Sequence, residues 1–114
     1  MNFHVVETQI RYLTFDEGGR KTGMYSGYRG QFYYDGEDFD GFQYFPDIGR
    51  EMPVELGREV RAFVRFNGDR WDEIHRYKLY EGKVFLIREG PKTVGEGIVT
   101  RLEVPKPEWN GLCN

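Results

Sequence analysis

Apolar and polar positions alternate near the start of the chain. The positions expected to face inward are Val6, Thr8, Ile10 and Tyr12, and each is separated from the next by a charged or amide residue. A period of two residues is typical of a strand with one buried face. Similar patterns predict strands over residues 31–34, 53–66, 83–88 and 93–104, with turns at the Asp-Gly pair 35–36 and the Asn-Gly-Asp run 67–69.

The clearest hairpin joins residues 83–88 to residues 93–104 through the four-residue turn 89–92, which contains Gly90 and Pro91. Gly95 and Gly97 lie inside the second of these strands, where glycine indicates a bulge, a barrel corner or a close backbone approach. No period of 3.6 residues continues for three turns. The pattern therefore predicts about six short strands in a closed antiparallel barrel or a sandwich. The segment 105–107 is expected to be extended and to lead into a C-terminal tail.

Composition agrees with this pattern and excludes several classes of protein. The 114 residues carry a net charge of −3, 17% are aromatic and fifteen are glycine, which favours one domain of strands and tight turns. A single cysteine, Cys113, excludes an internal disulfide and favours the cytoplasm. No apolar run resembles a signal peptide or a membrane span. Because the chain is acidic, nucleic-acid binding requires a local basic patch.

The candidate catalytic and cofactor-binding motifs in the sequence are incomplete. The run 18–22 ends like a phosphate-binding loop, but Arg20 and Phe15 occupy its two required glycine positions. Residues 95–97 lack the third glycine of a dinucleotide fingerprint, because Thr100 stands there. His4 and His75 have no metal-ligand spacing around them. We expect no cofactor, no metal site and no catalytic residue.

Acidic residues are concentrated between Asp35 and Asp47, interleaved with aromatic residues. The interpretation we favour is an acidic outer face over a strand whose aromatic side chains point inward.

Two longer segments carry a resemblance to a known family. Residues 17–34, EGGRKTGMYSGYRGQFYY, and residues 81–100, EGKVFLIREGPKTVGEGIVT, closely resemble the opening and the closing hairpin of the third, C-terminal β-barrel domain of elongation factor Tu. Residues 51–57, EMPVELG, are similar to the stretch before its central strand. The resemblance covers about residues 3–104. It implies a closed six-stranded antiparallel barrel over residues 1–104, with residues 105–114 as a C-terminal tail.

The resemblance also implies candidate RNA-contacting residues. In the family this domain helps to hold the T-stem of aminoacyl-tRNA through sugar and phosphate contacts. The matching positions in this chain are Arg20, Lys21, Gln31, His75, Glu89 and Gly90. Lys21 stands where a histidine is common, and His75 falls where a lysine is usual. Asp40 lies near the position of a threonine that contacts RNA in the family, and its charge repels phosphate.

Two functions from different classes follow. The first is a non-catalytic, translation-factor-like module that binds tRNA or other structured RNA. The second is a protein-interaction module whose partner is a translational GTPase, a ribosomal protein or a second copy of the chain. Met24, Tyr25 and Tyr28 would form its docking patch if they are exposed and not part of the core. We expect no enzymatic activity, because these residues contain neither a GTPase domain nor a phosphate-binding loop.

Overall fold

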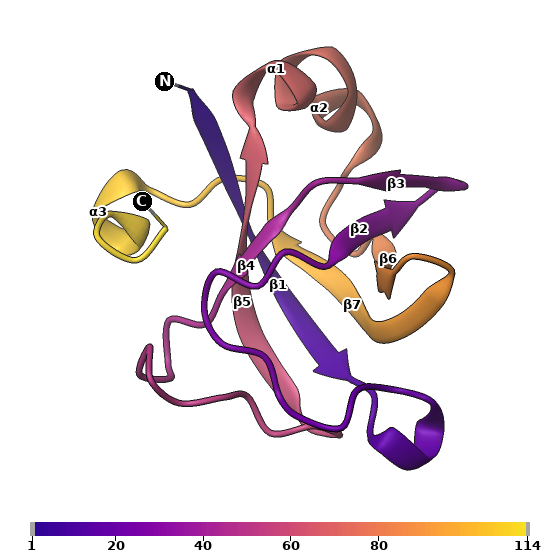
Figure 1. The fold of residues 1–114 in the computed structure, drawn as a ribbon. Coiled ribbons are helices and arrows are strands. Elements are labelled where there is room, and N and C mark those ends of the chain that lie inside the picture. The colour runs from indigo at the N-terminus through magenta and orange to yellow at the C-terminus, as the bar shows by residue number, and fades with distance from the viewer. Residues whose placement is uncertain (1, 114) are drawn as a thin grey trace.

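The computed structural model describes residues 2–113, which form one curled antiparallel sheet with short helical segments at its ends (Figure 1). Along the chain the strands are β1 (Phe3–Tyr12), β2 (Gln31–Tyr34), β3 (Glu37–Phe39), β4 (Phe42–Tyr44), β5 (Glu59–Asn67), β6 (Val84–Glu89) and β7 (Lys92–Arg101). The helical elements are η1 (Phe15–Glu17), α1 (Gly68–Arg70), η2 (Trp71–His75), α2 (Arg76–Lys78) and α3 (Lys106–Trp109). The order of strands in the sheet is β3-β2-β6-β7-β1-β5-β4.

The inner face of the curled sheet holds the main core. The four residues of β1 that alternation predicts to face inward, from Val6 to Tyr12, are fully buried there, which confirms that prediction. Phe32 of β2 stacks on Phe85 of β6 with ring centroids 4.2 Å apart, and it meets Phe66 of β5 edge to face at 5.0 Å. Each such ring contributes about 1.5–3 kcal/mol through burial. These aromatic contacts hold the two halves of the sheet around one interior.

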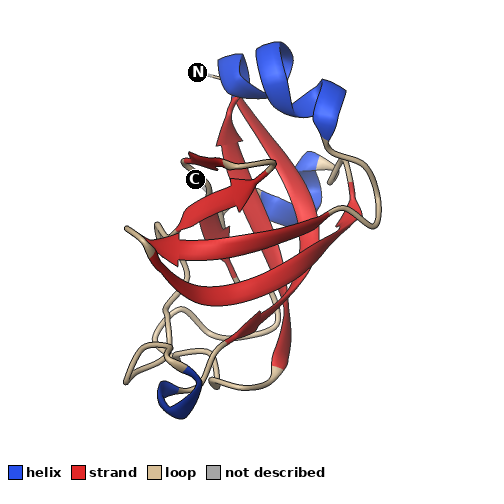
Figure 2. Cartoon of the chain, turned by 90° about the vertical axis from the view of Figure 1, so that its right-hand side faces the viewer, coloured by secondary structure: helices blue, strands red, loops and turns tan. Residues whose placement is uncertain are grey.

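The closed six-stranded barrel expected from the resemblance is not observed among the described residues. The expected strand across the acidic stretch is broken at Asp40 and Gly41 into β3, which pairs with β2, and β4, which pairs with β5. An added Cβ at Gly41 would lie 3.0 Å from a methyl group of Val64 and 3.2 Å from the Cβ of Phe32. The break therefore lies where the backbone crosses close over the core. No ladder joins β3 to β4. The two ends of the curled sheet (Figure 2) are linked by the chain itself and by one isolated bridge, in which Gln43 of β4 pairs with Tyr28 just before β2.

The predicted hairpin is confirmed as β6 and β7, with Glu89 opposite Lys92 at its end. The turn contains Gly90 at φ +60°, a left-handed conformation that glycine adopts without strain. Gly97 allows close packing, because an added Cβ would lie 2.5 Å from the ring of Phe85 and 2.7 Å from the carbonyl oxygen of Gln9. The interpretation of this glycine as a point of close approach is confirmed.

Residues 68–78 are helical where the sequence pattern predicted only a turn at 67–69. The side-chain oxygen of Asn67 accepts hydrogen bonds from the backbone N–H groups of Asp69 and Arg70, which caps the segment. The ring of Trp71 stacks on His4 with centroids 3.6 Å apart. The missed signal is short: Trp71, Ile74 and His75 have the i, i+3, i+4 spacing of one helical face.

The chain after Val104 does not form the expected extended tail. Instead α3 begins at Lys106, and the following residues pack against the outer face of β1, β4 and β5 (Figure 1). Cys113 is fully buried in a second apolar cluster with Val5, Tyr44, Phe63 and Val104. Burial of the thiol raises the pKa of Cys113 to about 12.

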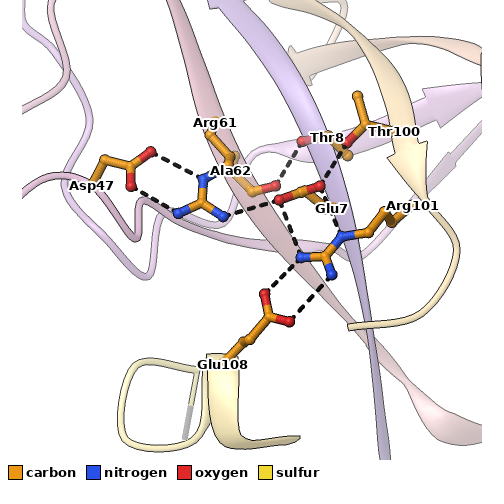
Figure 3. A network of polar contacts seen from close by, with 8 residues as sticks. All are labelled: Glu7, Thr8, Asp47, Arg61, Ala62, Thr100, Arg101 and Glu108. Carbon is orange, nitrogen blue, oxygen red and sulfur yellow. Dashed lines mark hydrogen bonds and ion pairs between the residues drawn. The ribbon is translucent and has the colours of Figure 1, made fainter. Parts of the chain in front are cut away.

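An ionic network ties α3 to this face of the sheet (Figure 3). Arg101 of β7 bonds Glu108 of α3 at 2.7 Å and Glu7 of β1 at 2.9 Å. Arg61 of β5 bonds the same Glu7 at 3.0 Å and Asp47 at 2.8 Å. Burial favours the neutral form of Glu7, but the hydrogen bonds from Arg101 and Arg61 outweigh it and lower its pKa. The carboxylate of Glu7 is thus the centre of the network.

Candidate RNA-contact surface

The position of Arg20 is set by the turn that precedes it. The N–H of Glu17 donates to the hydroxyl of Thr14, and the Glu17 carboxylate accepts from the N–H of Thr14, which forms a capping box at the N-terminal end of η1. Gly18 then adopts φ +95°, and the N–H of Gly19 donates to the carbonyl of Thr14 at 2.8 Å. An added Cβ at Gly19 would lie 2.2 Å from the carbonyl oxygen of Leu13. The glycine pair therefore directs the chain so that Arg20 reaches the β6–β7 turn.

Arg20 meets Glu89, which is 69 residues further along the chain. Its guanidinium forms an ion pair with the Glu89 carboxylate at 3.2 Å and lies over the ring of Tyr28 at 5.4 Å. The hydroxyl of Tyr28 donates to the same carboxylate oxygen. Burial and the neighbouring Glu89 both raise the pKa of Tyr28 above its usual value, so the hydroxyl remains a donor. The three side chains form one hydrogen-bonded cluster at the surface.

Gln31 begins β2 and pairs in register with Arg88 of β6. This pairing brings Gln31 beside the β6–β7 turn. The guanidinium of Arg88 lies over the ring of Tyr33 at 4.3 Å and donates to the carbonyl of Gly90 at 3.2 Å. Four of the six residues that the resemblance identifies therefore lie on one surface, namely Arg20, Gln31, Glu89 and Gly90.

This surface is hollowed by a shallow pocket of about 400 Å³. Its walls include Arg29 and Arg88, which the resemblance did not identify as contacts. The guanidinium of Arg29 lies over the ring of Phe42 at 5.0 Å and is exposed. Sequence reasoning could have identified Arg88 from its cross-strand position opposite Gln31, but only after the strand register was known. We call this surface, with Arg20, Arg29, Gln31, Arg88, Glu89 and Gly90, the arginine surface.

Arg20, Lys21 and His75 do not line this pocket, and Arg20 joins the surface through its ion pair with Glu89. Lys21 is exposed, with its ammonium group 5.6 Å from the centre of the Phe15 ring. It adjoins Arg20 in the chain and remains available to an anion that spans both residues. Met24 is buried and Tyr25 is half exposed, so of the expected docking patch only the tyrosines reach the surface.

His75 is fully buried and lies away from the arginine surface. Its Nδ1 is hydrogen-bonded to the hydroxyl of Tyr34 at 2.7 Å, and its ring packs against Phe39 and Phe66 with centroids 4.7 and 4.4 Å away. Burial is the main cause that lowers the pKa of His75 to about 4. A buried, neutral imidazole cannot reach an RNA phosphate, so the interpretation of His75 as a phosphate donor is at odds with the structure.

The acidic stretch has the expected exposed carboxylates and inward aromatic rings, although its strand is broken into β3 and β4. The carboxylates from Asp35 to Asp47 are exposed, whereas Tyr44 and Phe45 are buried and Phe39 is half-buried. Asp40 lines a second hollow on the far side of Gln31 and not the arginine surface.

Within residues 2–113, no three His, Cys, Asp or Glu side chains gather in a way that suits a metal ion. None of the helices over the same range is long and apolar enough to cross a membrane.

The fold and the surface together define a small all-β module in which one loop and one hairpin turn present polar side chains around a shallow pocket. The chain belongs to the elongation factor Tu C-terminal domain family, whose family model matches residues 2–103. It is therefore a translation-factor-like module, and the family is non-catalytic.

Proposed function

We propose that this protein binds tRNA or another structured RNA through the arginine surface and adjoining Lys21. The observation that supports this proposal is the meeting of Arg20 and Gln31 with Glu89 and Gly90, from two segments far apart in sequence. The resemblance implies that all four match positions that contact tRNA in this family, to which the chain belongs.

The chemistry of the surface suits a sugar-phosphate backbone. The guanidinium groups of Arg20, Arg29 and Arg88 are donors with a fixed charge. The backbone N–H of Gly90 adds one neutral donor in the β6–β7 turn, because the next residue, Pro91, has no N–H. The carboxylate of Glu89 is an acceptor, which fits a ribose 2′-hydroxyl and not a phosphate. Few cations face the RNA, so we expect weak and salt-sensitive binding without base specificity.

The test is a titration of fluorescein-labelled tRNA with the protein, followed by anisotropy at about 25 mM and about 200 mM salt. We expect micromolar binding at the lower salt and a log–log salt slope of about −2 to −3, for two or three phosphate contacts. Arg20→Ala should weaken binding about fivefold and make the slope shallower by about one unit. Gln31→Ala should weaken binding without changing the slope, because an amide releases no counterion.

Arg58→Ala is the matched control. Its side chain is 73% exposed, lies outside the arginine surface and has Glu55 as its ion-pair partner at 3.6 Å. We expect wild-type affinity and slope from this variant. The proposal fails if the wild-type protein shows no salt-sensitive binding at micromolar concentration, or if Arg58→Ala and Arg20→Ala weaken binding equally.

A second candidate function is docking to another protein, such as a translational GTPase, a ribosomal protein or a second copy of the chain. It is favoured by Val84 and Ile98, which face each other across β6 and β7 and are 65% and 41% exposed. The variant Val84→Ser/Ile98→Thr tests it. A partner that is retained from nuclease-treated extract by wild type and lost with the variant, or a dimer that dissociates, would support docking. Equal recovery by both proteins would count against it.

A further inference from the structure

A second groove, of about 670 Å³, lies between the end strand β3 and the helical segment that follows β5. Figure 1 shows α1 and α2 on the same side of the molecule as β3. One wall carries Glu37, Asp38, Phe39 and Asp40, and the opposite wall carries Asp69, Arg70, Glu73 and Ile74. The groove adjoins the arginine surface, because Gln31 lines both.

The strand β3 offers a free sheet edge to this groove. It is the last strand of the sheet and pairs only with β2, through Tyr34 with Glu37 and Phe32 with Phe39. In the part of the chain that the structure describes, no strand pairs with its other side. An unpaired edge presents backbone donors and acceptors, and an extended segment of another chain satisfies them by adding as a strand.

The groove is strongly negative. Its walls hold five carboxylates and one guanidinium, that of Arg70. Asp38 has a cationic partner, Arg88, at 3.6 Å. For residues 2–113, the carboxylates of Glu37, Asp40, Asp69 and Glu73 form no ion pair within the groove or outside it. Like charges in this arrangement repel RNA phosphates and attract cationic side chains.

Protection of the sheet edge does not explain all of this charge. Carboxylates on β3 discourage pairing with another copy of the same acidic edge. However, Asp69 and Glu73 project from the opposite wall, where edge protection does not require them. The half-buried side chains of Phe39 and Ile74 supply apolar contacts between the walls, which suit the aliphatic stems of Lys and Arg.

We propose that this groove binds a basic, extended segment of a partner protein. The segment adds as a strand to the free edge of β3 and places Lys or Arg side chains between the carboxylates of the two walls. This ligand is a polycation, whereas the arginine surface beside the groove is proposed to bind an anionic RNA, so the two sites select ligands of opposite charge.

The experiment uses a fluorescein-labelled peptide of alternating Lys and Val residues, with the full-length protein, in an anisotropy titration. At about 25 mM salt we expect micromolar binding that weakens at least about tenfold at about 200 mM salt. Asp69→Asn/Glu73→Gln should weaken binding by about tenfold, because both changes keep the size of the side chain and remove its charge. Glu51→Gln/Glu81→Gln removes the same charge from exposed positions outside the groove and should bind as wild type does.

A second peptide tests pairing with the edge strand. It has the same sequence, with alternate backbone nitrogens methylated so that they cannot donate hydrogen bonds to β3. We expect it to bind at least about fivefold more weakly than the parent peptide. The proposal is overturned if the methylated peptide binds equally well, if the two double variants behave alike, or if a Glu-Val peptide binds as tightly as the Lys-Val peptide.

Discussion

The buried imidazole of His75 makes the stability of this protein depend on pH in a range above that of the carboxylates. The native pKa of His75 is about 4, mainly because burial disfavours the charged form, whereas an unfolded histidine has a value of 6.5. As pH falls below 6.5 the unfolded chain takes up a proton that the native protein does not bind. Stability therefore falls as pH decreases from about 7.5 to 4 and then levels off for this group.

The size of the effect follows from the two pKa values. The full difference between the native and unfolded pKa values lowers the free energy of unfolding by about 3 kcal/mol below pH 4. About 2 kcal/mol of this stability is already lost between pH 8 and pH 5. The depressed carboxylates, such as Glu7 and Glu108, lose their contribution at lower pH, since their pKa values lie below 4.5. The interval from pH 8 to pH 5 therefore isolates the histidines. His4 acts in the same direction, because burial lowers its pKa as well.

Urea unfolding at pH 8, 7, 6 and 5 measures this dependence. The informative variant is Tyr34→Phe/His75→Phe, which removes both partners of the buried hydrogen bond and leaves neither unsatisfied. Only the change with pH within each protein is compared, so any packing cost of the substitution cancels. Between pH 8 and pH 5, we expect the free energy of unfolding of the variant to fall by about 2 kcal/mol less than that of the wild type. His4→Gln is the control that measures the contribution of the other histidine. An NMR titration in which the His75 ring protonates near pH 6.5, or equal pH dependence of variant and wild type, would refute the burial argument.

Two further predictions test the packing of the sheet. Gly97→Ala should destabilise the protein by about 1–3 kcal/mol, because the new methyl group meets the Phe85 ring and a backbone carbonyl. Thermal melting should show a clear fall in Tm for this variant. Glu96→Ala, at an exposed neighbouring position, should change Tm little. The thiol of Cys113 should not react with a disulfide reagent at pH 8 in the native protein, because it is fully buried and its pKa is about 12. Trp109→Ala loosens the segment that covers this thiol and should make it react; continued protection in this variant would contradict the role of α3 as a cover.

Some features of the candidate site could be predicted from the sequence and others could not. The Gly-Gly-Arg loop and the Glu-Gly turn could be identified because their residues are contiguous and their glycines have local conformational causes. The resemblance identified Arg20 and Glu89 as RNA-contacting positions, but their ion pair is seen only in the structure. The addition of Arg88 required the register of β2 on β6. His75 was misplaced because a lone histidine in a polar run gives no sign of burial. The apolar face that His75 shares with Trp71 and Ile74 extends over only one helical turn, which is too short a pattern to predict a helix.

Local chemistry in the sequence determined β1 and the β6–β7 hairpin, whereas the strand predicted over residues 53–66 begins only at Glu59. Alternation in β1 and the glycine of the β6–β7 turn act over two to four residues, so their effect is visible without a fold. Tertiary structure decided the rest. Phe63 alternates along β5 with two arginines, Arg61 and Arg65, on the same face. It is nevertheless buried, because the segment after Val104 folds back over it. The break between β3 and β4 and the placement of His75 likewise depend on side chains that meet only through sheet pairing, and no local pattern records which distant residues will be neighbours.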